Sequence, residues 1–327
     1  MPDLIPDLPH AAASPTSGSR TSSSNGPLTD TSDAAWLSSA RKPSIRRDLR
    51  EIFVDEFWTY RGLAYELTRR DIRVRYKQTI MGFGWAVLMP MLIVLSGALV
   101  RYAMAFVSGH HLAIEELAGI AVKAIPWSFF VGSMGFATTS LVGNANLMTK
   151  IYFPREMLPL AATLAQSFDS AIGTIALLII CPLVGVHFGL GLLWFPLLAA
   201  CVFLYTAGSA LLTGCANLFL RDVKYLVQVL LTFGIFFTPV FFEPYMFGRL
   251  GARIMMLNPL APLLEGLRLS VVYNHQLLEP LVVTTVHGPV VAWSPWYLAY
   301  SVTWAVVIFF VGLLVFHRAE NKFAEYV

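Results

Sequence analysis

The sequence predicts an all-α membrane protein in which an amphipathic cytoplasmic interface helix precedes six transmembrane helices. Of the 327 residues, 56% are hydrophobic and 13% are charged, whereas about a quarter of the residues in a soluble domain are charged. Uncharged runs of 18 or more residues recur along the chain, and about this length lets a helix cross the roughly 30 Å hydrocarbon core. We interpret the chain as one membrane domain that follows a polar N-terminal segment.

The first fifty residues are expected to be disordered. From Ser14 to Asp33, 15 of 20 residues are Ser, Thr, Gly or Pro, and such a stretch buries too little apolar surface to offset its ordering entropy. Residues 1–50 are interpreted as a linker or as a regulatory tail. They lack the apolar core of a cleavable signal peptide, so insertion is expected to depend on the first span.

An amphipathic helix is predicted over residues 51–81. Its apolar residues recur at intervals of three and four, which is the helical period, at Phe53, Phe57, Tyr60, Ala64 and Leu67. Five basic residues follow within nine positions: Arg69, Arg70, Arg73, Arg75 and Lys77. Gly82 and Gly84 then provide a flexible corner, where a helix in the membrane plane can turn into one that crosses it.

The basic cluster has two interpretations that the residues leave open. It anchors the helix at an anionic leaflet, where each Lys or Arg contributes about 1 kcal/mol. Alternatively it binds a phosphate-bearing lipid headgroup, because the guanidinium fork matches phosphate oxygens. The aromatic residues Trp58 and Tyr60 on the same helix suit either an interface or stacking on sugar rings.

Six spans are predicted, at about 83–107, 120–148, 157–184, 190–219, 224–243 and 290–316. The third and fourth come from dividing a stretch of 51 residues without charge, Ser170 to Leu220, at its Pro-, His- and Gly-containing middle. Eleven lysines and arginines lie between Arg41 and Lys77, and the second and fourth connections and the tail 317–327 are also basic. Because cytoplasmic flanks retain positive charge, both termini are predicted to be cytoplasmic.

Five segments then resemble a known family. They read "ELTRRDIRVRYKQTIMGFGWAVLMP" from Glu66, "NLMTKIYFPREMLP" from Asn146, "LFLRDVKYLV" from Leu218, "LNPLAPLLEGLR" from Leu257 and "RAENKFAEYV" at the C-terminus. Together they resemble the permease subunit of ABC-2 type exporters of lipid-linked polysaccharides, which handle O antigen of lipopolysaccharide, capsule and teichoic acid. The resemblance covers roughly residues 50 to 327.

The resemblance implies an ABC-2, type V exporter-like fold in the bacterial inner membrane and a homodimer. It implies export of a polyprenyl diphosphate-linked glycan by two copies of this chain together with two copies of a cytoplasmic ABC ATPase. The other expected partners are membrane lipids, and no nucleic acid is expected to bind. The sequence has no GxxxxGK[ST] loop for ATP phosphates. We therefore expect no cofactor in this chain, with ATP and Mg bound by the partner ATPase, and no enzymatic activity of its own.

The resemblance also implies roles for particular residues. The headgroup gate would comprise Arg69, Arg70, Arg73, Arg75, Lys77, Trp58 and Tyr60. ATPase coupling would involve Lys150, Tyr152, Phe153, Pro154, Arg155, Glu156, Arg221 and Asp222. An outer gate at about 254–273 would include Asn258, Pro259, Glu265 and Arg268. A simple helix turn for the coupling loop and a peripheral loop for the outer gate remain the structural alternatives.

Candidates for the substrate pathway are Trp85, Trp127 and Asp169. Asp169 lies 12 residues after Met157, hence about 18 Å along a helix. An ionised Asp at that depth costs about 2.5 to 3.5 kcal/mol. It should therefore face the substrate path or bond to a neighbouring helix.

Other chemistry is not indicated. Cys181, Cys201 and Cys215 have no metal-ligand spacing and are interpreted as small apolar side chains. His110, His111, Glu115 and Glu116 lie close together in the sequence, but we assign no metal site. A drug or lipid exporter of the ABC-2 class is the nearest alternative function, whereas a membrane-embedded glycosyl or acyl transferase would need a cytoplasmic acid/base cluster that the sequence does not offer.

Overall fold

The computed structural model describes residues 57–327 except 78, 80, 110, 112, 151–152, 286–287, 321–322 and 324–327. The expectation of disorder over 1–50, and the first six residues of the helix predicted at 51–81, lie outside the described residues.

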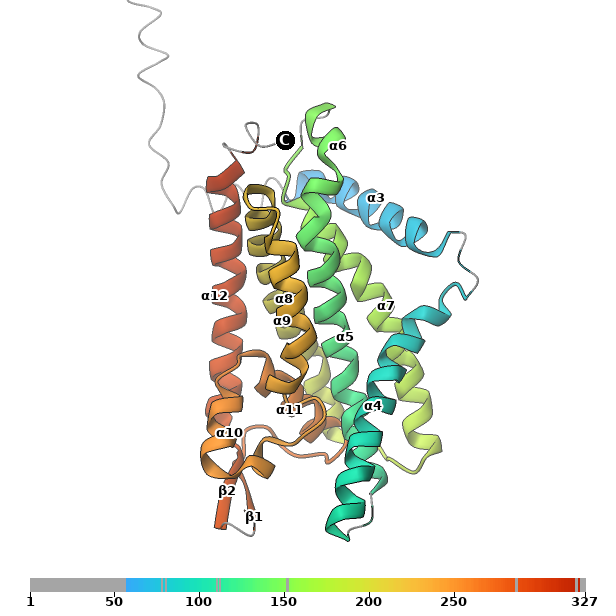
Figure 1. Ribbon diagram of the computed structural model, residues 1–327, viewed down its shortest axis with the longest axis vertical. Helices are drawn as coiled ribbons and strands as arrows, with labels where there is room; N and C mark the ends of the chain where they lie inside the picture. The colour runs from blue at the N-terminus through green and yellow to red at the C-terminus, as the bar shows by residue number, and fades with distance from the viewer. Residues whose placement is uncertain are drawn as a thin grey trace, which may run out of the picture. The chain divides into compact units, whose positions relative to one another are not determined.

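Long helices that run alternately up and down form the bundle (Figure 1). They are α4 (Gly84–Ser108), α5 (Ile114–Gly143), α7 (Met157–Leu183), α8 (Phe195–Phe219), α9 (Val223–Phe237) and α12 (Pro295–Glu320). Helix α5 packs against α7 and α8, and α8 packs against α12. The short α6 (Ala145–Lys150) and the C-terminal end of α12 lie at one end of the bundle, and α10 (Gly248–Met256) lies at the opposite end.

Within the described residues, five helices are long and apolar enough to cross a membrane. They cover Gly84–Val107, Ile114–Gly143, Met157–Leu183, Leu190–Phe219 and Pro295–Glu320, the fourth beginning with the 3-10 helix η2 (Leu190–Trp194). Helix α9 is apolar but has only 15 residues, about 22 Å. The helical fold class is confirmed, while the crossing by α9 that six spans require stays a prediction.

Several predicted boundaries differ from the structure. Helix α5 begins at Ile114 rather than near 120 and places Glu115 and Glu116 in its first turn. Carboxylates there interact favourably with the helix dipole. It ends at Gly143, so the end predicted at 148 falls in α6. The span predicted at 224–243 ends at Phe237, because Thr238 adopts extended backbone before Pro239.

The segment between α9 and α12 contains a β-hairpin that was not predicted. Strand β1 (Leu281–Thr285) pairs antiparallel with β2 (Gly288–Trp293), so the start of the last span near 290 was wrong and α12 begins at Pro295. The buried indole of Trp293 donates to the carbonyl oxygen of Leu277 over 2.9 Å. The same region has the 3-10 helix η3 (Pro244–Phe247) and two short α-helices, α10 and α11 (Leu260–Val271). The outer gate predicted at 254–273 covers the end of α10 and all of α11.

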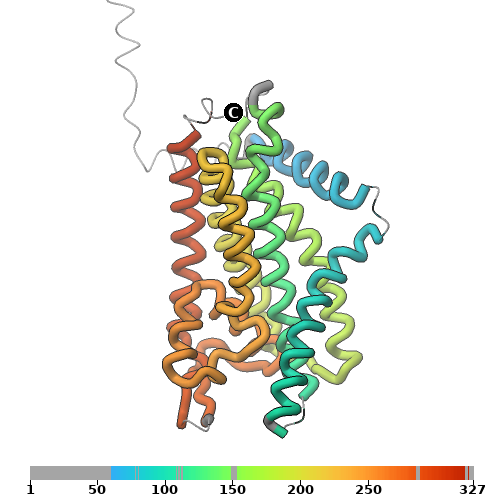
Figure 2. The backbone as a smooth tube through the Cα atoms, in the orientation of Figure 1, coloured from blue at the N-terminus to red at the C-terminus, as the bar shows by residue number. Residues whose placement is uncertain are grey.

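Helix α3 (Phe57–Tyr76) precedes the bundle and packs against α7. Ala64 and Leu67 are buried in a cluster that includes Met157 and Leu158, so the predicted apolar face of this helix contacts protein. The chain then turns into α4 (Figure 2) at Gly82, whose φ of +49° is a left-handed conformation that glycine adopts at low cost. The position of α3 at a membrane interface stays a prediction.

Small residues allow α8 and α12 to approach closely. A Cβ added at Gly208 would lie 2.6 Å from the backbone of Ile308 and Phe309, and one at Gly312 would lie 2.6 Å from the carbonyl oxygen of Gly208. The three cysteines are free and buried, which fits the expectation that they act as small apolar side chains.

We expect Gly208→Ala to lower the thermal unfolding temperature of the detergent-solubilised protein. The added methyl meets backbone, which cannot move aside as a flexible side chain can, and overpacking of this kind costs about 1 to 3 kcal/mol. The control is Gly135→Ala in α5, where an added Cβ meets nothing within 4 Å and helix propensity improves. Equal stability of the two variants would contradict the close approach.

Candidate functional site

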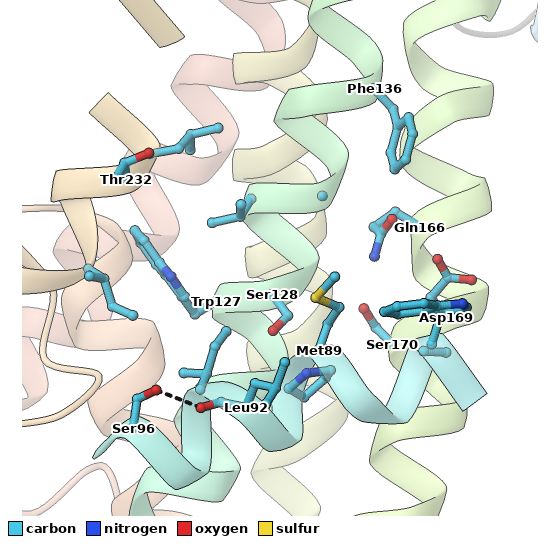
Figure 3. Close-up of a pocket in the computed structure, with 18 of the residues that line it drawn as sticks. Met89, Leu92, Ser96, Trp127, Ser128, Phe136, Gln166, Asp169, Ser170 and Thr232 are labelled. Carbon is cyan, nitrogen blue, oxygen red and sulfur yellow. Dashed lines mark hydrogen bonds between the residues drawn. The ribbon is translucent and has the colours of Figure 1, made fainter. Parts of the chain in front are cut away.

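A cavity of about 650 Å³ opens between α3, α4, α5, α7 and α9. All three predicted pathway residues, Trp85, Trp127 and Asp169, line it. In Figure 3, Gln166, Asp169 and Ser170 lie on the side of α7, while Trp127 and Thr232 lie on the opposite side. Polar side chains of α7 therefore form one wall of the cavity, and transport through it stays a prediction.

Asp169 is 7% exposed and is held by the last turn of α3. Its Oδ2 accepts from Arg75 Nη1 over 2.5 Å, and its Oδ1 accepts from the Tyr76 hydroxyl. Burial and the bond to Asp169 raise the pKa of Tyr76, so its phenol stays a donor at neutral pH. Asp169 thus bonds to another helix and also lines the cavity, while its place on a substrate path stays a prediction.

Arg75 has two further neighbours in the cavity. Its Nη1 also donates to Gln166 Oε1 over 2.8 Å, and its guanidinium carbon lies 4.0 Å from the ring centroid of Phe136. The side chains of Arg75 and Asp169 are 18% and 10% exposed. The pair is therefore largely withdrawn from water. A lone charge buried in this way would be costly.

The rest of the predicted headgroup gate does not line the cavity. Arg69, Arg70, Arg73 and Lys77 are exposed, and the first two pair with Glu66 and Asp71 of the same helix at 3.8 and 2.8 Å. Tyr60 is half-buried against the cluster beneath α3, and the side chain of Trp58 lies outside the described residues. Of the five basic residues, all of them described, Arg75 alone lines the cavity.

The predicted coupling residues divide into two groups. Phe153, Pro154 and Glu156 are buried, and Arg155 donates to the backbone oxygen of Glu320 over 3.2 Å at the end of α12. Arg221 and Asp222 are exposed between α8 and α9. Tyr152 and the side chain of Lys150 lie outside the described residues.

Two of the predicted outer gate residues, Glu265 and Arg268, belong to a second group of charges, here called the outer ion cluster. Glu265 pairs with Arg268 and lies 3.9 Å from Lys123 Nζ. Arg101 binds Glu243 at 2.7 Å and Glu116 at 2.5 Å. Three basic and three acidic residues thus connect α4, α5, α11 and the segment before η3: Arg101, Lys123, Arg268, Glu116, Glu243 and Glu265. Four of them, Arg101, Lys123, Glu116 and Glu243, were not predicted from sequence to belong to such a cluster.

The remaining outer gate residues shape the start of α11. Asn258 Oδ1 accepts from the backbone N–H of Leu260 over 3.1 Å, and its Nδ2 donates to Thr238 Oγ1 over 3.1 Å. Pro259 directly precedes the helix. These contacts fix how the segment after α9 enters α11.

A bundle of long apolar helices around a cavity with a neutralised ion pair defines a multi-pass membrane protein. The family model for the ABC-2 type transporter matches residues 63–272, and the chain belongs to this family. Its members are transport permease subunits.

Curated relatives carry more particular names. The chain is similar to the O-antigen export system permease protein RfbA of Myxococcus xanthus, with 26% identity over 74% of this chain and 92% of the relative. A protein of the same name from Klebsiella pneumoniae is 22% identical over 80% of this chain and 94% of the relative.

We expect Glu265→Gln to destabilise the protein strongly. The change leaves the buried Lys123 and Arg268 without this carboxylate, and breaking a buried pair costs about 3 to 5 kcal/mol. Glu66→Gln, which removes the exposed partner of Arg69, should cost at most about 1 kcal/mol. Thermal unfolding in detergent measures both.

The pH dependence of stability provides a second test of the Glu265 charge. Burial raises the pKa of Glu265, but Arg268 and Lys123 lower it by more, so its pKa lies below the ordinary value. Its contribution is present above the unfolded-state pKa and is lost as the pH falls through the folded one. Glu265→Gln should therefore lose less stability on acidification than the wild type, and an equal loss would contradict the role of this charge.

Proposed function

We propose that the chain is the transmembrane permease subunit of an ATP-driven ABC transporter that exports an O antigen-like polysaccharide, linked to polyprenyl diphosphate, from the cytoplasm across the bacterial inner membrane. The observation that carries the proposal is the alignment with permeases named for O-antigen export over 92% and 94% of their length. The cavity supports it, because a cationic group on a polar wall suits an anionic carrier and aromatic residues suit sugar rings.

The proposed assembly has two copies of this chain and two copies of a cytoplasmic ATPase that binds ATP and Mg. Both termini would be cytoplasmic, which places the end of the bundle with α6 and the end of α12 on the ATPase side. Arg221 and Asp222 would meet the ATPase there. Phe153, Pro154 and Glu156 would act indirectly, because they are buried and can pass a displacement on to α7.

Deletion of the chromosomal copy should abolish surface polysaccharide while its lipid-linked form accumulates in the cytoplasmic leaflet. Wild type should restore export, whereas Arg69→Gln, Arg70→Gln and Arg73→Gln combined should not, because the exposed charges that attract an anionic headgroup are gone. Extraction of lipid-linked sugars and surface labelling measure the two pools, and membrane immunoblots check insertion. Unchanged glycan in both pools would favour a drug or lipid exporter.

Arg221→Ala with Asp222→Ala should reduce co-purification of the ATPase several-fold without changing thermal stability, since both residues are exposed and interfacial charge truncations cost about 1 kcal/mol or more. Arg253→Ala, an exposed charge on α10 at the other end of the bundle, is the matched control. Equal ATPase recovery with both variants would remove this connection from the interface.

A further inference from the structure

We propose that Asp169 is a specificity-determining residue that keeps ordinary phospholipid headgroups away from Arg75 and yields to a diphosphate diester. In this role it is the built-in counter-ion of the one basic residue of the cluster that lines the cavity. The inference rests on the proposed function for the identity of the carrier lipid, but its test uses binding alone.

The geometry shows a closed pair that can still accept a ligand. Both hydrogen bonds of Arg75 within the described residues leave from Nη1, toward Asp169 and Gln166. The guanidinium has five N–H donors, so Nε–H and Nη2–H can serve incoming oxygens. Phe136 supports one face of the guanidinium and fixes its plane without neutralising it.

The neighbours of the pair hold both charges in place. A Cβ at Gly132 would lie 2.6 Å from the Gln166 side chain, so α5 and α7 leave this amide little freedom. Tyr76 donates to the other carboxylate oxygen. Arg75 and Asp169 are thus prepositioned, and a ligand pays little to order them.

Selectivity follows from the charge that Asp169 supplies. A phosphodiester headgroup such as phosphatidylglycerol carries one negative charge, the same as Asp169, so exchanging one for the other gains little and leaves Asp169 buried without its partner. A diphosphate diester carries two charges and more acceptor oxygens, so it can engage Nε and Nη2 and outweigh the repulsion. Specificity built by opposing the wrong ligand is a general device.

The test is binding to the purified full-length chain in detergent, measured by native mass spectrometry. The two probes are phosphatidylglycerol and a farnesyl diphosphate ester of N-acetylglucosamine. The measured quantity is the affinity for the diphosphate ester divided by the affinity for phosphatidylglycerol. Asp169→Asn should strengthen phosphatidylglycerol binding about tenfold or more and so reduce the ratio, because the carboxylate that neutralises Arg75 and repels a phosphate beside it loses its charge. Arg75→Gln should weaken diphosphate binding by a similar factor.

The matched control is Asp71→Asn, which removes a half-buried carboxylate that pairs with Arg70 on the same helix and does not line the cavity. It should leave the ratio unchanged. The double variant Arg75→Gln with Asp169→Asn holds neither charge, so it stays measurable if the single Asp169 variant unfolds. It should bind the diphosphate as weakly as Arg75→Gln and gain no phosphatidylglycerol.

Two results would overturn the inference. One is an unchanged ratio in folded Asp169→Asn. The other is a double variant that binds phosphatidylglycerol more tightly than the wild type, because the gain would then not come from a freed Arg75. Failure of the proposed function would appear separately, as unchanged surface and lipid-linked glycan in cells, whatever the binding ratio.

Discussion

Neutralisation of charge away from water is the constraint on which this structure depends. An ion that leaves water inside a membrane protein costs several kcal/mol unless an opposite charge lies within bonding distance. In the described part of the chain two groups satisfy the constraint: Arg75 with Asp169, and the outer ion cluster around Lys123, whose side chain is fully buried. The first group joins α3 to α7, and the second joins α11 to α5, so the charges hold α3 and α11 in place.

The two groups also differ in how firmly they are closed. The outer ion cluster balances three basic against three acidic residues, and Glu265 lies between two cations. The Arg75 and Asp169 pair instead borders a cavity of about 650 Å³. A closed cluster is suited to holding an outer segment against α4 and α5, whereas a pair beside a cavity can exchange one partner for a ligand.

Much of the helical part could be predicted from sequence, because uncharged runs and helical periodicity are local signals. The predicted spans at 157–184 and 190–219 match α7 and η2 with α8 within a residue or so. The β-hairpin was missed because Gly288 to Phe316 reads as one uncharged run, and only the pairing of β1 with β2 separates its first residues from α12. Asp169 was singled out for its depth in a predicted span, and Arg75 as one of five clustered basic residues. Their contact joins residues 94 positions apart, which no local pattern reveals.

The contact between α3 and α7 also bears on the two interpretations of the basic cluster. Orientation in a membrane depends on how many positive charges flank a span, and it is indifferent to where each side chain points. Recognition depends on direction, and among the five basic residues only Arg75 reaches the cavity, while the exposed four remain where they can attract anionic lipid. In the proposed function one short segment would serve both purposes, because the exposed residues that would set topology and Arg75, which would meet the ligand, are different members of the same helix.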